Sequence, residues 1–390
     1  MKNNDYETKY IKVLDGIRAL SIMMIIWFHF WQQSWIMPHI GNFDLNFLPR
    51  YGFLLVDMMI LLSSFCLFLP YARSKIYQEE IPNTKEFYFN RFARIYPSYI
   101  ISMIIAIIFI VLSSKTINLN FFIKDTITHL LFTHNFFQDI LQNTNYFGVL
   151  WTLGVEVQFY LLFPYLAKKF IKRPLVTYFI MIIIGLISTF LISLNVTGKN
   201  ISLLVNHTLT FIPVYANGML AAWLYVKYTK NKNRFMKKDL FFTSISILCI
   251  ILYGYICYSV GTPHMFILQK SQIDYRFILS IIFTIFIIST IMSYKIYRLI
   301  FENKIMKFIA LISFNLYIYH QFIAVKLKEF RIPYWEGNTP PNMLGNTKWQ
   351  WEYLILCIVI SIIVAIIMTY LVERPIAKYL KNKYKKNLNK

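Results

Sequence analysis

Residues 14–30 read LDGIRALSIMMIIWFHF, a mostly apolar run long enough to form most of a helix that crosses a bilayer. The run nevertheless carries Asp15, Arg18 and His29, whose ionisable side chains are costly to bury in hydrocarbon. Such side chains in a membrane helix face the bundle interior or a water-filled cavity rather than lipid. The stretch therefore predicts a membrane protein with a polar site inside it.

The composition of the chain agrees with a protein that crosses the membrane many times. Its 390 residues are 57% hydrophobic and 15% charged, whereas soluble domains are about 25% charged. Ten segments have the length and composition of spans: 11–31, 51–70, 96–114, 149–167, 174–194, 204–226, 240–260, 275–294, 308–326 and 351–372. The prediction is an all-α, polytopic membrane helical bundle forming one domain over residues 1–390. The bundle would occupy residues 11–372, and a basic cytoplasmic tail residues 373–390.

The basic residues predict the orientation of these spans. If the N-terminus is cytoplasmic and the spans alternate, 29 of the 40 Lys and Arg residues fall in inner segments and nine in outer ones. Cytoplasmic loops carry such an excess of Lys and Arg. Both termini are therefore expected in the cytoplasm. The net charge of +22 is spread along one membrane face, where it meets anionic lipid headgroups, so no nucleic-acid partner is predicted.

Arg18 and His29 are eleven residues apart in the first span. In a helix this step is about 20° from a whole number of turns and about 16 Å of rise, so both side chains project from one face. Arg18 would lie in the inner part of the membrane and His29 near the outer end. Asp15 precedes Arg18 by three residues, a spacing that allows an ion pair. The alternative is that Arg18 reaches back to the inner interface and His29 caps the outer end.

A pair of arginines lies at the expected cytoplasmic start of the third span. The stretch FNRFARIYP, residues 89–97, places Arg91 and Arg94 on one helical turn. Because arginine binds phosphate with a planar fork, the pair suggests a docking site for a phosphorylated cytoplasmic molecule. Ordinary basic flanking of a membrane helix is the alternative.

Two later spans also carry ionisable residues. WTLGVEVQFYLLFP, residues 151–164, places Glu156 about 10 Å below the outer end of its span, near the depth expected for His29. Its carboxylate could orient an imidazole or bind a hydroxyl, or make a structural hydrogen bond. SFNLYIYHQF, residues 313–322, places His320 in the outer half of the ninth span, where a structural role is the alternative.

The remaining polar features are expected to be structural. Segment 115–148 is amphipathic and too polar to span, so it would lie on the outer surface or cover a site. His129 and His134 are five residues apart, which does not stack them on one helix face, and no metal site is predicted. In LVERPIAKYL, residues 371–380, Pro375 is expected to stop or kink the last helix.

Taken in chain order, these motifs resemble those of the membrane acyltransferase-3 family. LDGIRAL with the later FH resembles the family's Arg, ten residues, His motif, and RFAR its Arg-x-x-Arg motif. WTLGVEVQFYLLFP is similar to the Trp-Ser-Leu-x-x-Glu-x-x-Phe-Tyr segment, and SFNLYIYHQF and VERP match late motifs. Two positions depart from the pattern: Ser64 stands where glycine is usual, which would alter close helix packing, and Thr152 stands where serine is common.

The resemblance implies a bacterial, multi-pass plasma-membrane O-acyltransferase. It would move an acyl group, most simply acetyl, from cytoplasmic acyl-CoA to a hydroxyl of an extracytoplasmic acceptor such as a cell-surface polysaccharide. No tightly bound cofactor is implied, since acetyl-CoA is a substrate, and no oligomeric state is specified. The implied catalytic residues are His29, Arg18 and Glu156. The implied donor-binding residues are Arg91, Arg94 and Arg18, and Asp15, Tyr160 and His320 would support them.

Two other classes of protein stay open. A transporter or flippase of a glycan, lipid or small acid also uses intramembrane His, Arg and Glu, but the chain shows no repeated halves with matched broken helices. A membrane scaffold would leave Arg18 and His29 unexplained. Some family members carry an extracytoplasmic esterase-like domain after the membrane domain, and none follows the ten spans in this sequence. A final transfer step would then take place in the membrane domain or on a separate protein.

Overall fold

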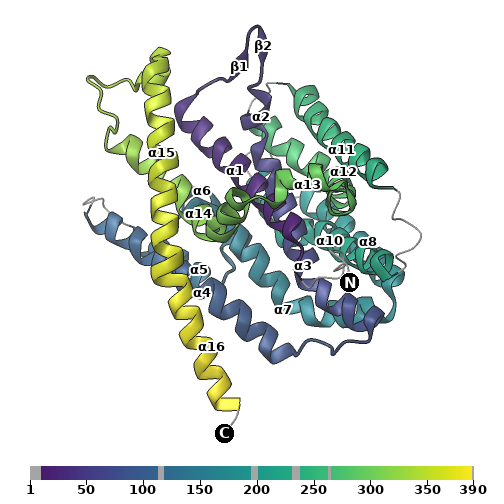
Figure 1. The fold of residues 1–390 in the computed structure, drawn as a ribbon. Helices are drawn as coiled ribbons and strands as arrows, with labels where there is room; N and C mark the ends of the chain where they lie inside the picture. The colour runs from purple at the N-terminus through teal and green to yellow at the C-terminus, as the bar shows by residue number, and fades with distance from the viewer. Residues whose placement is uncertain (1–9, 113–117, 195–200, 231–237, 262–264, 389–390) are drawn as a thin grey trace. The chain divides into compact units, whose positions relative to one another are not determined.

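The computed structural model describes residues 10–112, 118–194, 201–230, 238–261 and 265–388, and these are almost entirely helical. Figure 1 shows the helices coloured along the chain. Parts of four predicted segments lie outside the described residues: the first nine residues, residues 113–114 of the third span, residues 115–117 of the amphipathic segment, and the last two residues of the tail. The all-α prediction is confirmed for the described part of the chain.

The prediction of ten membrane spans is confirmed, because ten helices in the described part of the chain are long and apolar enough to cross a bilayer. These are α1 (Lys12–Ser34), α3 (Leu55–Tyr77), α4 (Thr84–Leu112), α7 (Trp151–Lys172), α8 (Pro174–Leu194), α10 (Ile212–Lys230), α11 (Asp239–Val260), α12 (Met265–Met292), α14 (Lys304–Glu329) and α15 (Thr347–Ile367). The shorter elements are β1 (His39–Ile40), β2 (Phe43–Asp44), α2 (Phe47–Arg50), α5 (Leu119–Leu130), α6 (Gln138–Asn143), α9 (Ile201–Asn206), α13 (Lys295–Glu302) and α16 (Arg374–Leu388). β1 and β2 form a small antiparallel hairpin.

The third span begins twelve residues earlier than the predicted start at residue 96. Helix α4 starts at Thr84 and has 29 residues, or about 43 Å at 1.5 Å per residue. The hydrocarbon core is about 30 Å thick, so this helix is long enough to extend beyond it. Arg91 and Arg94 therefore lie in the N-terminal half of a continuous helix rather than in a preceding loop.

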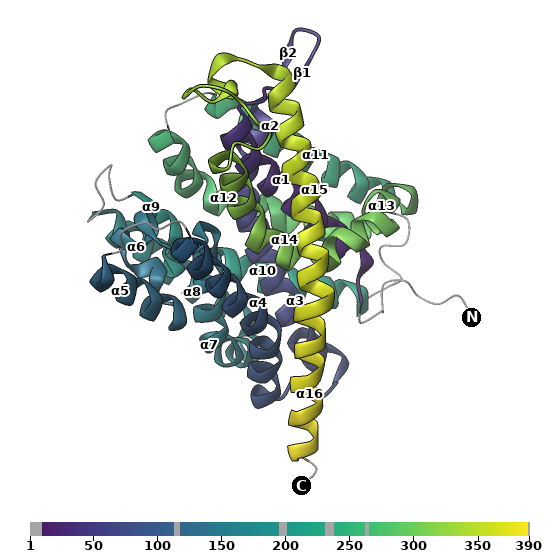
Figure 2. The same cartoon turned by 90° about the vertical axis from the view of Figure 1, so that its left-hand side faces the viewer.

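The last span does not stop at Pro375. A π-helical stretch, Met368–Glu373, joins α15 to α16, and the helix continues to Leu388. The two helices run on from each other in both views (Figures 1 and 2). Proline lacks an N–H and its ring crowds the carbonyl four residues earlier, and wider π turns are a common local adjustment in such helices. The expected stop was wrong because the helix adjusts its turns before the proline.

Contacts within the chain divide it into two compact units. The first comprises residues 1–23, 54–83 and 161–311, and the second comprises residues 24–53, 84–160 and 312–390. The boundaries fall inside α1, α7 and α14.

The first unit contains a close approach of α3 and α10. A Cβ on Gly218 would lie 2.5 Å from the carbonyl oxygen of Leu61 and 2.7 Å from Cβ of Ser64. Ser64, at the position where the family usually has glycine, donates its hydroxyl to the carbonyl of Tyr215 at 2.7 Å. The close packing is therefore maintained by a glycine on α10, and the serine adds a hydrogen bond between the two helices.

A buried ion pair also joins helices of the first unit. Arg276 on α12 donates from Nε to Asp57 on α3 at 3.1 Å, from Nη1 to Thr210 at 2.7 Å and from Nη2 to the carbonyl of Val205 at 3.0 Å. Both charged side chains are almost fully buried. The guanidinium also lies 3.8 Å from the ring centroid of Phe211. The partners hold α3 and α12 to the segment before α10, which accounts for an arginine inside a predicted span.

Candidate active site

His29 lies in the second unit, near the C-terminal end of α1. Its Nδ1 atom is 3.0 Å from Oε1 of Gln32 and 3.2 Å from Nε2 of Gln321 on α14. Gln32 follows His29 by three residues, so one helical turn brings the two side chains together. Both amide contacts are to Nδ1, so Nε2 is the ring nitrogen left available to a substrate.

The ring of His320 on α14 lies beside His29, with 5.0 Å between the ring centroids. Nδ1 of His320 is 2.7 Å from the carbonyl oxygen of Tyr317 and 3.1 Å from that of Leu316. His320 is fully buried, and its Nε2 has no hydrogen-bond partner among the residues that the structure describes. The structure thus brings together two histidines that are 291 positions apart in the sequence.

The start of α7 contributes the next part of the site. The hydroxyl of Tyr317 donates to the carbonyl of Val149 at 3.3 Å and also contacts Thr152. Thr152 keeps a hydroxyl where the family commonly has serine, and it donates to Val149 at 3.1 Å. Glu156, one turn further along α7, lies close enough to Tyr317 to interact electrostatically. Its carboxylate accepts a hydrogen bond of 2.9 Å from Tyr160.

The site extends from Tyr160 to the N-terminal part of α4. The ring of Tyr160 meets the ring of Phe87 edge-on at 6.3 Å, and the guanidinium of Arg91 lies 5.9 Å from the centroid of Phe87. The second unit therefore holds a row of neighbouring side chains, which we call the Arg91–His29 row. It consists of Arg91, Phe87, Tyr160, Glu156, Tyr317, His320 and His29.

Arg94 has a different environment from Arg91. It is exposed and lies near the carboxylate of Glu373, at the end of the π-helical stretch. That carboxylate accepts a hydrogen bond of 2.7 Å from Asn315, which also donates to Thr369 at 2.9 Å. The carboxylate of Glu373 therefore ties the end of the last span to α14.

Arg18 and Asp15 belong to the first unit, on the N-terminal half of α1. Arg18 is half-buried and contacts Sγ of Cys66 on α3 at 3.9 Å. Asp15 accepts a hydrogen bond from Tyr10. Among the described residues, no ion pair joins Asp15 to Arg18, although their spacing allows one.

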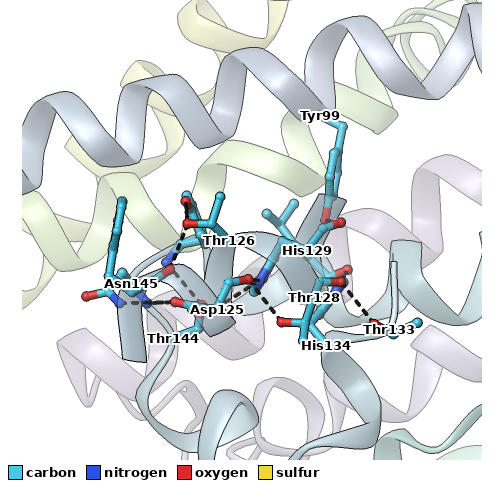
Figure 3. A network of polar contacts seen from close by, with 12 residues as sticks. Tyr99, Asp125, Thr126, Thr128, His129, Thr133, His134, Thr144 and Asn145 are labelled. Carbon is cyan, nitrogen blue, oxygen red and sulfur yellow. Dashed lines mark hydrogen bonds and ion pairs between the residues drawn. The ribbon is translucent and has the colours of Figure 1, made fainter. Parts of the chain in front are cut away.

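A second polar network lies in the segment between α4 and α7, and it is shown in Figure 3. Asp125 on α5 is fully buried and contacts Nδ1 of His129 at 2.9 Å. It also accepts hydrogen bonds from Thr144 and from the backbone N–H and side chain of Asn145. Burial alone would raise the pKa of Asp125, but the hydrogen bonds from His129 and Asn145 outweigh burial and hold that pKa below its ordinary value.

His134 joins this network to α7. Its ring stacks on His129 with 4.0 Å between centroids, and its Nε2 is 3.1 Å from the carbonyl of Leu150. Burial, with a smaller contribution from His129, lowers the pKa of His134 to about 3. The two histidines do not share a helix face, as their spacing predicts, but α5 ends at Leu130 and the turn that follows returns His134 to His129, so their rings stack all the same.

Close packing holds this segment against α7. A Cβ on Gly154 would meet Asn135 and His134 at 3.1 Å, and Gln158 donates to Asn135 at 2.7 Å. Helix α5 has 12 residues and is too short to cross a bilayer. This agrees with the prediction that segment 115–148 does not span the membrane.

Sequence reasoning did not identify Gln32, Gln321 and Tyr317 as parts of the site. Uncharged polar residues are common near the ends of membrane helices, so composition gave no signal for them. The spacing of Gln32 from His29, and the position of Gln321 next to His320, are the signals that could have identified the two glutamines.

Comparison with known proteins gives the class of the protein. Residues 11–370 match the family model described as "Acyltransferase domain". The chain therefore belongs to this acyltransferase family, and the resemblance seen in the motifs is confirmed. Its ten apolar helices make it a multi-pass membrane protein.

Individual relatives are similar over nearly the whole chain. Peptidoglycan O-acetyltransferase OatA of Listeria monocytogenes is 26% identical over 391 residues, which cover 96% of this chain and 57% of the relative. O-acetyltransferase OatA of Staphylococcus aureus is 25% identical over 390 residues, which cover 96% of this chain and 58% of the relative. This chain therefore spans less than three fifths of the length of these relatives. No solved structure matches it.

Proposed function

We propose that this protein transfers an acyl group, most simply acetyl, from cytoplasmic acyl-CoA to a hydroxyl of an extracytoplasmic glycan. The observation that carries the proposal is the Arg91–His29 row, because it connects an arginine near one end of the second unit's helices to an accessible imidazole nitrogen. Membership of the acyltransferase family supports the class of reaction. The names of the two OatA relatives support a cell-wall glycan as the acceptor.

The donor end of the site is assigned to the arginines of α4. Arg91 and Arg94 lie on one helical turn, and their planar guanidinium groups suit the phosphates of acyl-CoA. Arg18 is assigned to the donor as well, since it lies on α1 about 16 Å before His29 on the same helix face. The excess of basic residues on the segments expected inside favours a cytoplasmic donor.

The chemistry is assigned to His29. Its Nε2 takes the proton of the acceptor hydroxyl while that oxygen attacks the thioester carbonyl carbon. A new C–O bond forms, the C–S bond breaks, and the proton passes to the leaving thiolate as free CoA thiol. Nδ1–H donates to Oε1 of Gln32 at 3.0 Å, which leaves the lone pair of the ring on Nε2 for this step. Glu156, held by Tyr160, supplies a carboxylate along the same row.

The proposal is tested by acylation of cell-surface glycans in cells that express the protein. His29→Ala and Arg18→Ala are expected to lose acylation at least 100-fold, as loss of a general base or of a donor contact does. Both variants should insert into the membrane at wild-type levels. His39→Ala, which changes an exposed histidine on β1, is the matched control. Acylation at the wild-type level in either active-site variant would overturn the proposal.

Binding of acyl-CoA separates this function from a carrier. Purified protein is expected to bind acetyl-CoA or to hydrolyse it slowly, and Arg91→Ala should weaken the binding by about 10-fold through loss of a bidentate phosphate contact. Arg173→Ala, in the exposed turn between α7 and α8, should bind normally. A carrier of glycans or small acids would show no acetyl-CoA binding in any of these proteins.

A further inference from the structure

The tautomer of His320 is determined by its surroundings. Its Nδ1 lies within hydrogen-bond distance of two backbone carbonyl oxygens, those of Tyr317 and Leu316. Carbonyl oxygens only accept hydrogen bonds, so Nδ1 must carry the proton. In the neutral ring Nε2 then holds a lone pair and can only accept a hydrogen bond.

That acceptor has no donor in the protein. Nε2 of His320 is buried without a hydrogen-bond partner, and the whole side chain is fully buried. The rings around it belong to His29, Phe30 and Tyr317, and the hydroxyl of Tyr317 is directed to the carbonyl of Val149. A buried polar atom without a partner is unfavourable, and such atoms in folded proteins are usually satisfied by another group. A bound molecule that carries a hydrogen-bond donor would satisfy this nitrogen.

The position of His320 indicates which molecule this is. Its ring lies 5.0 Å from His29, the residue assigned to deprotonate the acceptor hydroxyl. That hydroxyl has one hydrogen, and it is given to Nε2 of His29. A hydrogen bond to His320 therefore requires a second donor on the same acceptor, close to the hydroxyl that reacts.

We propose that Nε2 of His320 accepts a hydrogen bond from a second hydroxyl or amide N–H of the acceptor, next to the hydroxyl that is acylated. His320 is then a specificity-determining residue that selects polyhydroxylated acceptors, such as sugars, over molecules with a single hydroxyl. This inference rests on the proposed function, because it assigns His29 as the base that acts on the acceptor.

The test compares acceptors that differ by one hydroxyl. Purified protein in lipid nanodiscs is given acetyl-CoA with 1,2-propanediol or 1-propanol, and with methyl glucoside or cyclohexylmethanol. The rate of ester formation is measured for each. The wild type is expected to prefer the acceptor with more hydroxyls in each pair by about 10-fold or more, since sites that hydrogen-bond a hydroxyl discriminate against analogues without it.

Three variants separate a specific role from a structural one. His320→Phe keeps a ring of similar shape without the acceptor nitrogen, so the preference should fall towards 1, because the rate with the acceptor that has more hydroxyls falls more than the rate with the other. His320→Gln, which restores an accepting oxygen, should recover part of the preference. Phe322→Leu changes an apolar residue two positions further along α14 whose ring packs on Phe147, and it should keep the full preference.

The outcomes distinguish this inference from the proposed function. Ester formation without a preference in the wild type, or an equal loss of both rates in His320→Phe and His320→Gln, overturns the role of His320 and leaves acyl transfer standing. If the wild type forms no ester from acetyl-CoA with any of the four acceptors, the proposed function fails, and the role of His320 fails with it.

Discussion

At the scale of single residues, the two glutamines at His29 decide how its ring is used. Gln32 comes from the same helix and Gln321 from α14, and both reach Nδ1. A hydrogen bond at one imidazole nitrogen sets the tautomer and the orientation of the other nitrogen. The proposed base thus depends on neutral side chains rather than on a carboxylate, since Glu156 is hydrogen-bonded to Tyr160.

Replacement of Gln32 tests this arrangement. In Gln32→Leu the ring of His29 loses a partner at 3.0 Å, so kcat is expected to fall by about 10-fold, a part of the effect of removing a general base. The KM for acetyl-CoA should stay near the wild-type value, because Gln32 is not assigned to the donor. Gln33→Leu is the control, since only the backbone carbonyl of Gln33 bonds to Lys328. Equal kcat values for the two variants would contradict the role of Gln32.

The sequence predicted the charged members of the site and missed the neutral ones. Arg18, His29 and Glu156 stand out because ionisable residues are rare in membrane helices. Gln32, Gln321 and Tyr317 do not stand out, because polar uncharged residues near helix ends need no special explanation. Their role depends on the contact of α1 with α14, and no local pattern in the sequence encodes that contact.

At the scale of an element, the stability of the segment between α4 and α7 depends on His134 staying uncharged. The pKa of this histidine is lowered from 6.5 to about 3 by burial, so the unfolded segment takes up a proton that the folded segment excludes. Stability from this residue is therefore present above about pH 6.5 and is lost as the pH falls towards 3. The slope is about 1.4 kcal/mol per pH unit. Asp125, whose pKa is lowered, adds acid sensitivity only at still lower pH, below its ordinary pKa.

Hydrogen exchange at pH 7 and pH 5 measures this effect. After correction for intrinsic rates, the opening free energy of amides in residues 118–150 should fall by about 2 kcal/mol between these pH values. In His134→Gln the fall should be much smaller, because the buried imidazole of His134 is no longer there to protonate. His39→Gln, which changes an exposed histidine on β1, should behave like the wild type. The same fall in His134→Gln as in the wild type would assign the acid sensitivity to another group.

The sequence predicted the elements better than their ends and their contacts. Hydropathy located all ten spans, but the polar start of α4, with Lys85, Glu86 and Arg91, hid twelve residues of the helix. The stacking of His129 on His134 was missed for a similar reason. It depends on where α5 ends, and the periodicity of a helix does not predict its last residue.

At the scale of the whole molecule, the distribution of charge and the proposed reaction together predict the side of the membrane from which the acyl donor is used. The chain has 29 Lys and Arg residues on the segments expected inside and nine on those expected outside, which favours cytoplasmic termini. In that orientation the N-terminal part of α4, with Arg91 and Arg94, faces the cytoplasm, and His29 lies towards the outer end of α1. Acyl-CoA is too polar to cross a bilayer, so the donor should be used from one side only.

Sealed membrane vesicles of opposite orientation test this directly. Inside-out vesicles are expected to release CoA from added acetyl-CoA, whereas right-side-out vesicles should show at least 10-fold less release until detergent opens them, since an intact bilayer excludes a multiply charged donor. Inside-out vesicles with His29→Ala should release no more CoA than vesicles without the protein. Equal release of CoA by both kinds of sealed vesicle would contradict the use of acetyl-CoA from the cytoplasmic side only. Release only by right-side-out vesicles would reverse the orientation of the chain and place Arg91 on the outer face, which would also remove the argument for a cytoplasmic donor.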